Sequence, residues 1–295
     1  MSQAHLDAIY SRINSFPSLP ATVSNVLKVT GDPESSANDL MIAILPDQSM
    51  CAALLKIANS AFFGLPRQVS TVEKAVMVLG FDEIKNIVLG KAVFNSFKEL
   101  QSSNKQSIEQ FWSHSFTCGL AAKIIAERVG LSPSEMFIAG LIHDIGKLAM
   151  LITFPNIYSH LLRNSEENWL QSCDNERELF FISHDEVAHR ILKRWLFPPR
   201  LLNSVGFHHR PGETGKMQLF SSAIQIADVI AHIFHAPWGS SSTAHRTLIL
   251  NMQADIFDIW HELELPCSSE EIQIWFDLLR ISRERDTAIL SIFTS

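Results

Sequence analysis

Cysteine is scarce in this sequence, and no two cysteines have the spacing of a zinc or redox motif. The four cysteines lie far apart, at Cys51, Cys118, Cys173 and Cys267. A chain of 295 residues with 46% hydrophobic residues can bury a large core without disulfide bonds. Residues 1–10 also lack the apolar stretch of a signal peptide. We therefore expect free, buried thiols and a cytoplasmic protein.

Positive charge is also limited. The formal net charge is −7, the sequence pI is about 5.9, and no long run of Lys and Arg occurs. Nucleic acids and anionic lipids are bound through clusters of such residues, so we expect neither as a partner. The longest apolar segment, 137–154, is interrupted by His143, Asp144 and Lys147, which argues against a membrane span.

Alternation of apolar and polar residues, the pattern of a β-strand, is nearly absent. Apolar residues instead recur at three- and four-residue intervals, which predicts an all-α protein. Polar residues at 101–106 predict a connector between two parts of the chain. The expected helices are 21–29, 37–45, 47–58, 70–79, 81–100, 106–129, one that starts at Ser132, 183–195, 198–210, 216–235, 244–263 and 269–293.

The segment His143-Asp144-Ile145-Gly146-Lys147 is flanked on both sides by apolar residues, and we expect it to lie inside one apolar helix. An ionised carboxylate is costly to bury unless a cation or another partner is present. An imidazole beside a carboxylate in such a helix therefore indicates a hydrolytic metal site.

Other polar residues fall on the apolar faces or at the ends of predicted helices. His114 shares a helical stripe with Phe111 and Cys118, His184 heads another stripe, and Asp228 lies among apolar residues. Each alone has an ordinary explanation as a hydrogen-bonded core residue. Together they provide nitrogen and oxygen ligands for one or two divalent ions, such as zinc, iron, manganese or nickel, with Asp144 as a possible bridge. The candidate ligands are His114, His143, Asp144, His184, His208, His209 and Asp228.

The remaining histidines have no comparable partners in the pattern. We interpret them as surface or ordinary core residues. They are His5, His160, His189, His232, His235, His245 and His261.

The order of the candidate ligands resembles the HD phosphohydrolase superfamily, and is most similar to its HD-GYP and HDOD branches. The N-terminal third narrows the resemblance to HDOD. The segments similar to the HDOD pattern are Leu19-Pro20, Asp32-Pro33, Leu55, 58–64, 75–80, and 192–195 followed by Pro198. The resemblance covers residues 16–235. It implies an N-terminal helical part, 16–105, packed on an HD-like part with the metal site, 106–235, and leaves 236–295 as a C-terminal helical extension.

HDOD proteins are regarded as bacterial signal-transduction modules, and many have lost their metal ligands. This sequence has a ligand-competent residue at each position that can be matched to the HD-GYP metal site. It lacks a Gly-Tyr-Pro element after His209 and has only two tyrosines, which disfavours cyclic di-GMP hydrolysis.

Two functions remain open. The resemblance favours a regulatory protein in which the metal stabilises the fold and a signalling protein is the partner. The alternative is a metal-dependent phosphohydrolase or phosphodiesterase acting on a phosphoester or nucleotide. Asp144 and Lys147 would then be catalytic, with Lys147 neutralising charge on the phosphate, and Arg210 would contact the ligand. The sequence does not predict the oligomeric state.

Overall fold

The regular secondary structure of the described residues is helical. The computed structural model describes residues 10–11, 13, 19–97, 105–165, 172–235, 260–262, 268–286, 289–290 and 292. These residues include no strand, which confirms the all-α prediction. The elements are α2 (Ala21–Gly31), α3 (Ala37–Ile44), α4 (Gln48–Ala58), α5 (Val72–Leu79), α6 (Phe81–Ser96), α7 (Lys105–Val129), α8 (Pro133–Ile142), α9 (Ile145–Thr153), α10 (Pro155–Ser165), α11 (Ser172–Phe180), α12 (His184–Arg194), α13 (Pro199–Gly206), the 3-10 helix η3 (Pro211–Met217), α14 (Gln218–His235) and α17 (Ser269–Arg285).

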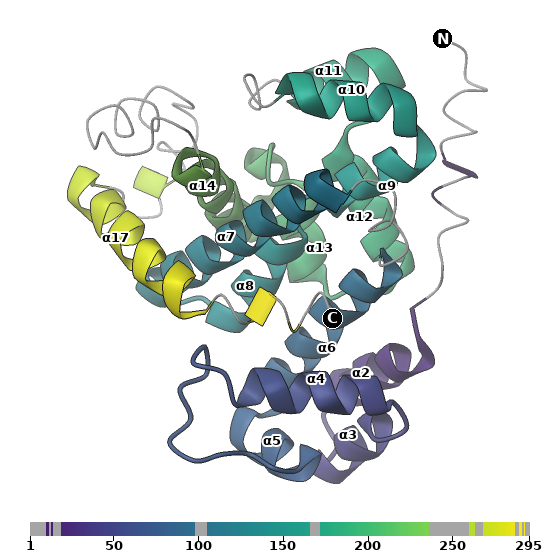
Figure 1. The fold of residues 1–295 in the computed structure, drawn as a ribbon, viewed down its shortest axis with the longest axis vertical. Coiled ribbons are helices and arrows are strands. Elements are labelled where there is room, and N and C mark those ends of the chain that lie inside the picture. The colour runs from purple at the N-terminus through teal and green to yellow at the C-terminus, as the bar shows by residue number, and fades with distance from the viewer. Residues whose placement is uncertain are drawn as a thin grey trace.

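Helices α2 to α5 pack together in the N-terminal part of the protein, at the bottom of Figure 1. Each begins and ends within two residues of its predicted bounds. Side-chain caps explain this agreement. Ser36 and Asp39 form a reciprocal capping box at the start of α3, and the Asp47 carboxylate accepts a hydrogen bond from the Met50 N–H at the start of α4.

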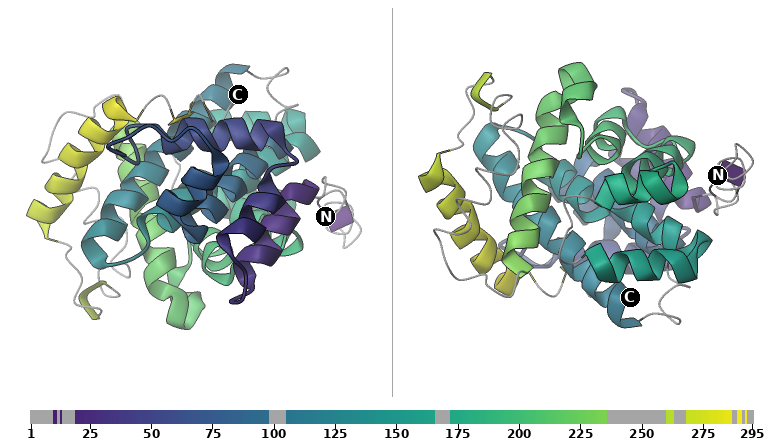
Figure 2. Two further views of the ribbon diagram at one scale, coloured as in Figure 1. Left: turned by 90° about the horizontal axis from the view of Figure 1, so that it is seen from below. Right: turned by 90° about the horizontal axis from the view of Figure 1, so that it is seen from above.

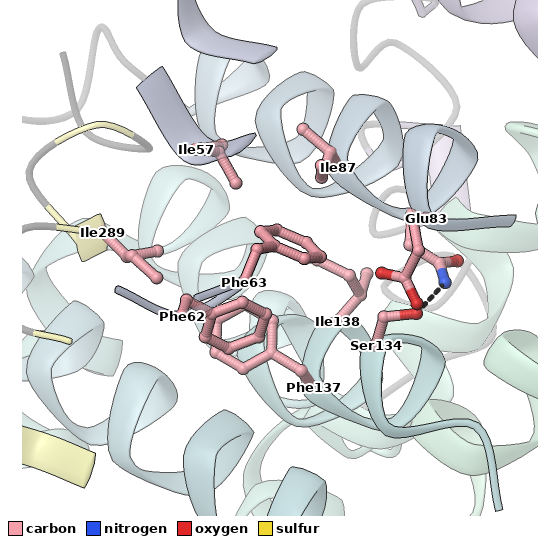
Figure 3. A pocket seen from close by; sticks show the side chains of 10 residues that line it. Ile57, Phe62, Phe63, Glu83, Ile87, Ser134, Phe137, Ile138 and Ile289 are labelled. Atoms are coloured by element: carbon pink, nitrogen blue, oxygen red, sulfur yellow. Dashed lines mark hydrogen bonds between the residues drawn. The ribbon is translucent and has the colours of Figure 1, made fainter. Parts of the chain in front are cut away.

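The loop after α4 joins the N-terminal part to the rest of the molecule. The Asn59 side chain donates to the carbonyl of Val69 and accepts from its N–H, both at 2.7 Å, so the two ends of the loop are held together. The loop places the Phe62 ring against the ring of Phe137 on α8, with the ring centroids 4.8 Å apart (Figure 3). The segment that resembles the HDOD pattern therefore has a structural task, which is to hold the two parts of the fold together.

Helix α6 lies between the two parts. It contacts α2, α4 and α5 on one side and α8 on the other. The amide of Asn86 donates to the hydroxyl of Ser134 at 2.8 Å across this junction. A small pocket lined mainly by apolar side chains, including Ile87 and Ile138, lies beside this bond (Figure 3).

In the HD-like part, α7 packs against α8 and α14, and α12 packs against α9 and α13 (Figures 1 and 2). Two glycines allow α7 and α8 to touch through their backbones. A Cβ atom on Gly140 would lie 2.8 Å from the carbonyl oxygen of Cys118, and one on Gly119 would lie 2.8 Å from that of Phe137. This close crossing brings His114 on α7 towards His143 after α8.

The prediction of one uninterrupted helix through HDIGK was wrong. Helix α8 ends at Ile142 and α9 begins at Ile145, and Asp144 has φ −98° and ψ 10°. The break points the side chains of His143 and Asp144 to one side of the chain, where the other polar residues gather.

Other predicted bounds also need correction. Helix α6 ends at Ser96 and α17 ends at Arg285, so both are shorter than expected within the described residues. Helices α10 and α11 were not predicted. The predicted helix at 244–263 lies outside the described residues except for 260–262, which are helical.

Two helical stretches are long and apolar enough to cross a membrane by length and composition alone. These are Pro133–Thr153 and Pro211–His235, whose most apolar windows are 89% and 67% buried inside the fold. Core helices of globular proteins meet the same criterion, so these stretches are weak evidence for a membrane span.

Candidate metal centre

The structure brings all seven predicted ligands together between α7, α9, α12 and α14. His114 lies on α7 and Asp228 on α14, while His184 is the first residue of α12. The remaining four come from chain breaks and helix ends: His143 and Asp144 precede α9, and His208 and His209 follow α13. Short segments far apart in the sequence thus meet at one buried point.

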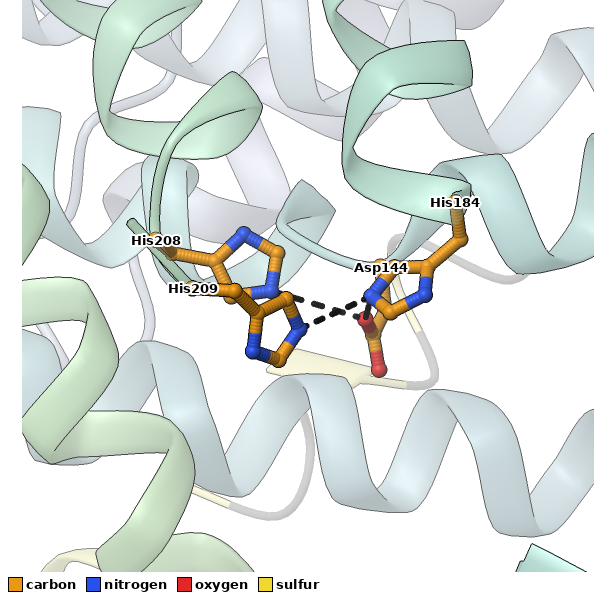
Figure 4. A group of neighbouring side chains, drawn as sticks. All are labelled: Asp144, His184, His208 and His209. Carbon is orange, nitrogen blue, oxygen red and sulfur yellow. Dashed lines mark hydrogen bonds and ion pairs between the residues drawn. The ribbon is translucent and has the colours of Figure 1, made fainter. Parts of the chain in front are cut away.

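One group of ligand atoms surrounds the Asp144 carboxylate (Figure 4). Its Oδ1 atom lies 3.1 Å from Nε2 of His184 and 3.9 Å from Nε2 of His208. Nε2 of His184 lies 3.0 Å from Nε2 of His209. Ligand atoms of the four residues all lie within 4.8 Å of one another, which is close enough to hold one metal ion.

A second group surrounds the Asp228 carboxylate. Its Oδ1 atom lies 2.9 Å from Nε2 of His114 and 3.2 Å from Nε2 of His143. The same Nε2 of His143 lies 3.3 Å from Oδ2 of Asp144. The two oxygens of Asp144 thus face different groups, which is the arrangement that a bridging carboxylate needs.

Hydrogen bonds to the protein fix which histidine nitrogens face the cluster. Nδ1 of His143 donates to the carbonyl of Gly140 at 2.8 Å, and Nδ1 of His208 donates to the carbonyl of Val205 at 2.7 Å. A backbone carbonyl can only accept, so these Nδ1 atoms carry the hydrogen. In each neutral imidazole, Nε2 therefore presents a lone pair to the cluster, as a metal ligand does.

Three buried atoms of the cluster lack a hydrogen-bond partner among the described residues. They are Nε2 of His143, Nε2 of His208 and Oδ1 of Asp144. Buried polar atoms are normally satisfied, so three buried polar atoms without a hydrogen-bond partner at one point need an explanation. The set of nitrogen and oxygen donors fits a divalent transition-metal ion.

Burial and neighbouring charges shift the pKa values of the cluster residues in opposite directions. Burial lowers the pKa of His143, but the neighbouring charges, Asp144 first, outweigh burial and raise it well above 6.5. Burial raises the pKa of Asp144, but His143, Lys147 and His184 together hold it well below 3.8. Burial and the charge of His143 lower the pKa of His208 to about 4. A metal ion would take the place of the protons that otherwise balance these carboxylates.

Glu176 supports His184, although the sequence pattern did not predict this role. Its buried carboxylate accepts hydrogen bonds from Nδ1 and from the backbone N–H of His184, both at 2.7 Å, and from the hydroxyl of Tyr158 at 2.6 Å. A carboxylate behind a histidine orients the ring and makes it a better ligand. Glu176 lies on α11, in the polar sequence SCDNERELF, which gave no signal of burial.

His232 also belongs to the cluster, although its place in the sequence pattern predicted a surface or ordinary core residue. Its Nε2 lies 3.4 Å from Oδ1 of Asp228. The four-residue spacing from Asp228 on one predicted helix was the available signal, because such residues lie on the same helix face. Burial and the charge of His114 hold the pKa of His232 well below 6.5.

Lys147 and Arg210 lie at the edge of the cluster. Nζ of Lys147 contacts Oδ2 of Asp144 at 2.6 Å, and the attraction of Asp144 outweighs burial, so the pKa of Lys147 is raised and the side chain stays charged. The Arg210 guanidinium instead binds the Asp185 carboxylate at 3.2 Å and contacts Glu213 at 3.1 Å. Lys147 is therefore close enough to contact a ligand at the cluster, whereas Arg210 is held by carboxylates beside it.

Gly146 explains how α9 and α12 approach closely enough to join Asp144 and His184. A Cβ atom at this position would lie 1.9 Å from the carbonyl oxygen of His184, closer than any real contact. The glycine of HDIGK is thus required by packing.

The expectation of free, buried thiols is met at Cys118 and Cys173, while Cys51 is half-buried. Cys267 lies outside the described residues. Burial raises the pKa of the Cys118 and Cys173 thiols, although both lie beside histidines of the cluster.

Comparison with known proteins gives the same fold. The chain is 24% identical over 204 residues, 68% of its length, to an uncharacterized protein of Treponema pallidum (strain Nichols), and spans 39% of that protein. A solved structure from Shewanella amazonensis SB2B, whose name proposes a phosphohydrolase, has a TM-score of 0.72 and 18% identity, with 97% of this chain and 98% of that chain covered. A Marinobacter aquaeolei VT8 structure, whose name proposes a signal transduction protein, has a TM-score of 0.72 and 21% identity, with 99% and 66% covered.

The model of the HDOD domain family matches residues 16–211. The match includes six of the seven predicted ligands, with Asp228 beyond its end. Because it covers more than half of the chain, the protein belongs to the HDOD domain family.

Proposed function

We propose that this HDOD protein is a metal-dependent phosphohydrolase that cleaves a phosphoester or nucleotide. The observation that carries the proposal is a group of three buried ligand atoms that lack hydrogen-bond partners. They belong to His143, Asp144 and His208. A cluster that served only to fill the core would leave these atoms unsatisfied at a substantial cost in stability. The name of the Shewanella amazonensis protein supports the same reaction class.

The geometry supports two metal positions that share Asp144. The first would use Asp144 with His184, His208 and His209, and the second would use Asp144 with His114, His143 and Asp228. Their nitrogen and oxygen donors suit iron, manganese, zinc or nickel. A divalent ion would supply Lewis acidity, which activates water and neutralises charge on a phosphoryl group.

The protein's own residues orient these groups and define the side from which substrate approaches. Glu176 and the carbonyls of Gly140 and Val205 fix the imidazole rings of His184, His143 and His208. The side chains of His114 and Lys147 are partly exposed, whereas His143 and His208 are fully buried. We expect the phosphate group to approach from the side of His114 and Lys147, where the lysine ammonium stabilises developing negative charge.

A signalling role without turnover is the second candidate, and a surface feature favours it. Large apolar side chains are exposed on α3 and α5, two helices that pack together: Ile42 is 57% exposed and Met77 is 72% exposed. Exposed apolar patches mark sites of protein contact. In this reading the metal stabilises the fold, and a cytoplasmic signalling protein binds the N-terminal part.

The test compares wild-type protein with Asp144→Ala in two assays, metal content by elemental analysis and hydrolysis of bis(p-nitrophenyl) phosphate and of nucleotides. The wild type should hold one to two equivalents of a transition metal and release product, and Asp144→Ala should lose both. Asp82→Ala is the control, because Asp82 is 80% exposed on α6 and far from the cluster in the sequence.

Persistent hydrolysis in Asp144→Ala would refute the mechanism. Metal without turnover in the wild type, across this range of substrates, would leave the signalling role as the better description. A wild-type protein that neither holds nor takes up metal would contradict both metal-dependent readings.

A further inference from the structure

Three imidazoles converge on one oxygen of Asp228. Oδ1 lies 2.9 Å from Nε2 of His114, 3.2 Å from Nε2 of His143 and 3.4 Å from Nε2 of His232. His114 and His232 also lie close to each other, with ring centroids 4.2 Å apart. Two of these imidazoles belong to the proposed second metal position, whereas nothing in the proposed function uses His232.

Positive charge is needed at the centre of this arrangement. Nδ1 of His143 is bound to the carbonyl of Gly140, so Nε2 faces Asp228 at 3.2 Å, an approach that is favourable when either a proton or a metal ion lies between the two atoms. A metal ion would replace that proton. The ligand atoms of His114, Asp228 and His232 all lie within 4.8 Å of one another, so one cation can reach all three.

We propose that His232 is a further ligand of the metal position formed by His114 and Asp228. The proposal rests on the metal site of the proposed function and is independent of whether the site hydrolyses phosphoesters. Asp228 and His232 are one helical turn apart on α14, so a single helix face supplies a carboxylate and an imidazole to the same ion. The His232 side chain is 23% exposed, so this ligand lies on the more open side of the cluster.

The ligand set has a consequence for metal binding. The second position gains an imidazole from a rigid helix, which strengthens its hold on soft first-row ions relative to magnesium or calcium. It also loses one coordination position that a substrate or water could occupy. We therefore expect removal of His232 to weaken the second metal equivalent and to change the geometry of the ion that remains.

The experiment titrates apo-protein with Co²⁺ and records both the stoichiometry and the visible d–d absorption, which reports on coordination number. His232→Ala should weaken the second equivalent at least about tenfold, as is typical when support for a metal is removed, and should change its absorption bands. His232→Gln keeps a polar side chain of similar length and so guards against a packing defect in His232→Ala. It should also weaken binding of the second equivalent of Co²⁺.

His235→Ala is the matched control. His235 lies on the same helix, three residues further on, is exposed, and contacts the hydroxyl of Thr117 at 2.9 Å rather than the ligand atoms. Unchanged binding and unchanged bands in folded His232→Ala and His232→Gln would overturn the inference while leaving the proposed metal site intact. Failure of the wild type to bind Co²⁺ would overturn the proposed site and this inference together. If the wild type binds Co²⁺ normally but hydrolyses no substrate, the proposed reaction is contradicted and the metal site is not. In that case, loss of the second Co²⁺ equivalent in His232→Ala would still support His232 as a ligand.

Discussion

Individual residues position the ligands of the cluster, and Gly146 does so without a side chain. Its hydrogen faces the carbonyl oxygen of His184, at the point where α9 passes the start of α12. This contact sets the separation between Asp144, just before α9, and the ring of His184, which is 3.1 Å from its carboxylate. A change at Gly146 therefore acts on the candidate metal site through the backbone.

We predict that Gly146→Ala both destabilises the protein and weakens metal binding. The added methyl group must push α9 away from α12, and overpacking of this kind typically costs about 1–3 kcal/mol. Chemical denaturation and elemental analysis measure the two effects. Gly31→Ala is the control, because a Cβ atom there has nothing within 4 Å. Equal stability and metal content in Gly146→Ala and wild type would show that the two helices can separate without consequence.

For individual residues, the sequence identifies the polar side chains that interrupt apolar patterns. Asp144 and Asp228 stand out because their neighbours are apolar, and both lie in the cluster. Glu176 could not be identified, because it lies among other charged residues and is buried only by the docking of α11. His232 lies four residues after Asp228, so the helix face that the sequence assigns to Asp228 also carries His232, and this signal was overlooked.

At the scale of elements, the C-terminal helix α17 is attached to α7 by a paired interaction. The guanidinium of Arg128 donates two hydrogen bonds to Glu271, at 2.6 and 2.9 Å, and the indole of Trp275 donates to the same carboxylate at 3.1 Å. The hydrogen bond from Arg128 lowers the pKa of Glu271 below its usual 4.5, and burial opposes this only in part. The ionised form of Glu271 thus favours the docked helix.

We predict that the contribution of Glu271 to stability depends on pH. Because its pKa is lower in the folded state, the stabilisation is complete above about pH 5.5 and is lost as the pH falls from 4.5 through the folded pKa. The melting temperature of Glu271→Gln should therefore lie below that of wild type at pH 7, and the gap should narrow in acid.

Glu270→Gln is the matched control for this experiment, because Glu270 is the preceding residue and its side chain is exposed. A gap between wild type and Glu271→Gln that stayed constant from pH 7 to below pH 4 would show that ionisation of Glu271 does not contribute. High salt should reduce the gap at pH 7, because the Arg128 side chain is open to solvent.

Helix starts were predictable where a side chain caps the helix. Ser132 accepts a hydrogen bond from the N–H of Glu135, and Pro133 lies in the first turn of that helix. Ser268 accepts a hydrogen bond from the N–H of Glu271. The break between α8 and α9 was not predictable from composition, because the residues on both sides are apolar. The two are separated by the contacts of His143 and Asp144 with other helices, which override the local preference for a continuous helix.

For the whole molecule, the cluster is a junction between helices that are distant in the sequence. The proposed metal ions would join α7, α9, α12 and α14 and the turn after α13, and so connect most of the HD-like part. Ligands that bind the folded state alone stabilise it in proportion to the logarithm of their concentration. Metal should therefore affect the stability of this entire part of the protein.

We predict that treatment with a chelator lowers the melting temperature and that addition of the metal restores it. An ion present at a hundred times its dissociation constant stabilises the folded state by about 2.7 kcal/mol. Differential scanning calorimetry with and without chelator measures the change, and Asp144→Ala should show no such response. Identical melting curves for metal-loaded and chelated wild type would argue against a metal that supports the fold.

The overall architecture followed from the sequence more completely than the site did. Helical periodicity and the resemblance at 58–64 correctly placed an N-terminal helical part against an HD-like part, and Asn59 explains why that segment matters. The arrangement of the ligands into two groups that share Asp144 depends on distances between five segments. Such distances arise from packing, as at Gly119 and Gly140, and periodicity does not contain them.

Asp144 occupies the residue before the first turn of α9, where an aspartate would ordinarily cap the helix. Its carboxylate makes no capping hydrogen bond and is directed to Lys147 and the imidazoles instead. A capping side chain is worth about 1 kcal/mol, so the helix begins without a stabilisation that its own sequence could supply. On the proposed function, this position therefore gives up helix stability in favour of metal binding. Selection for thermal stability alone would favour a rotated Asp144 that caps α9 and no longer faces the cluster.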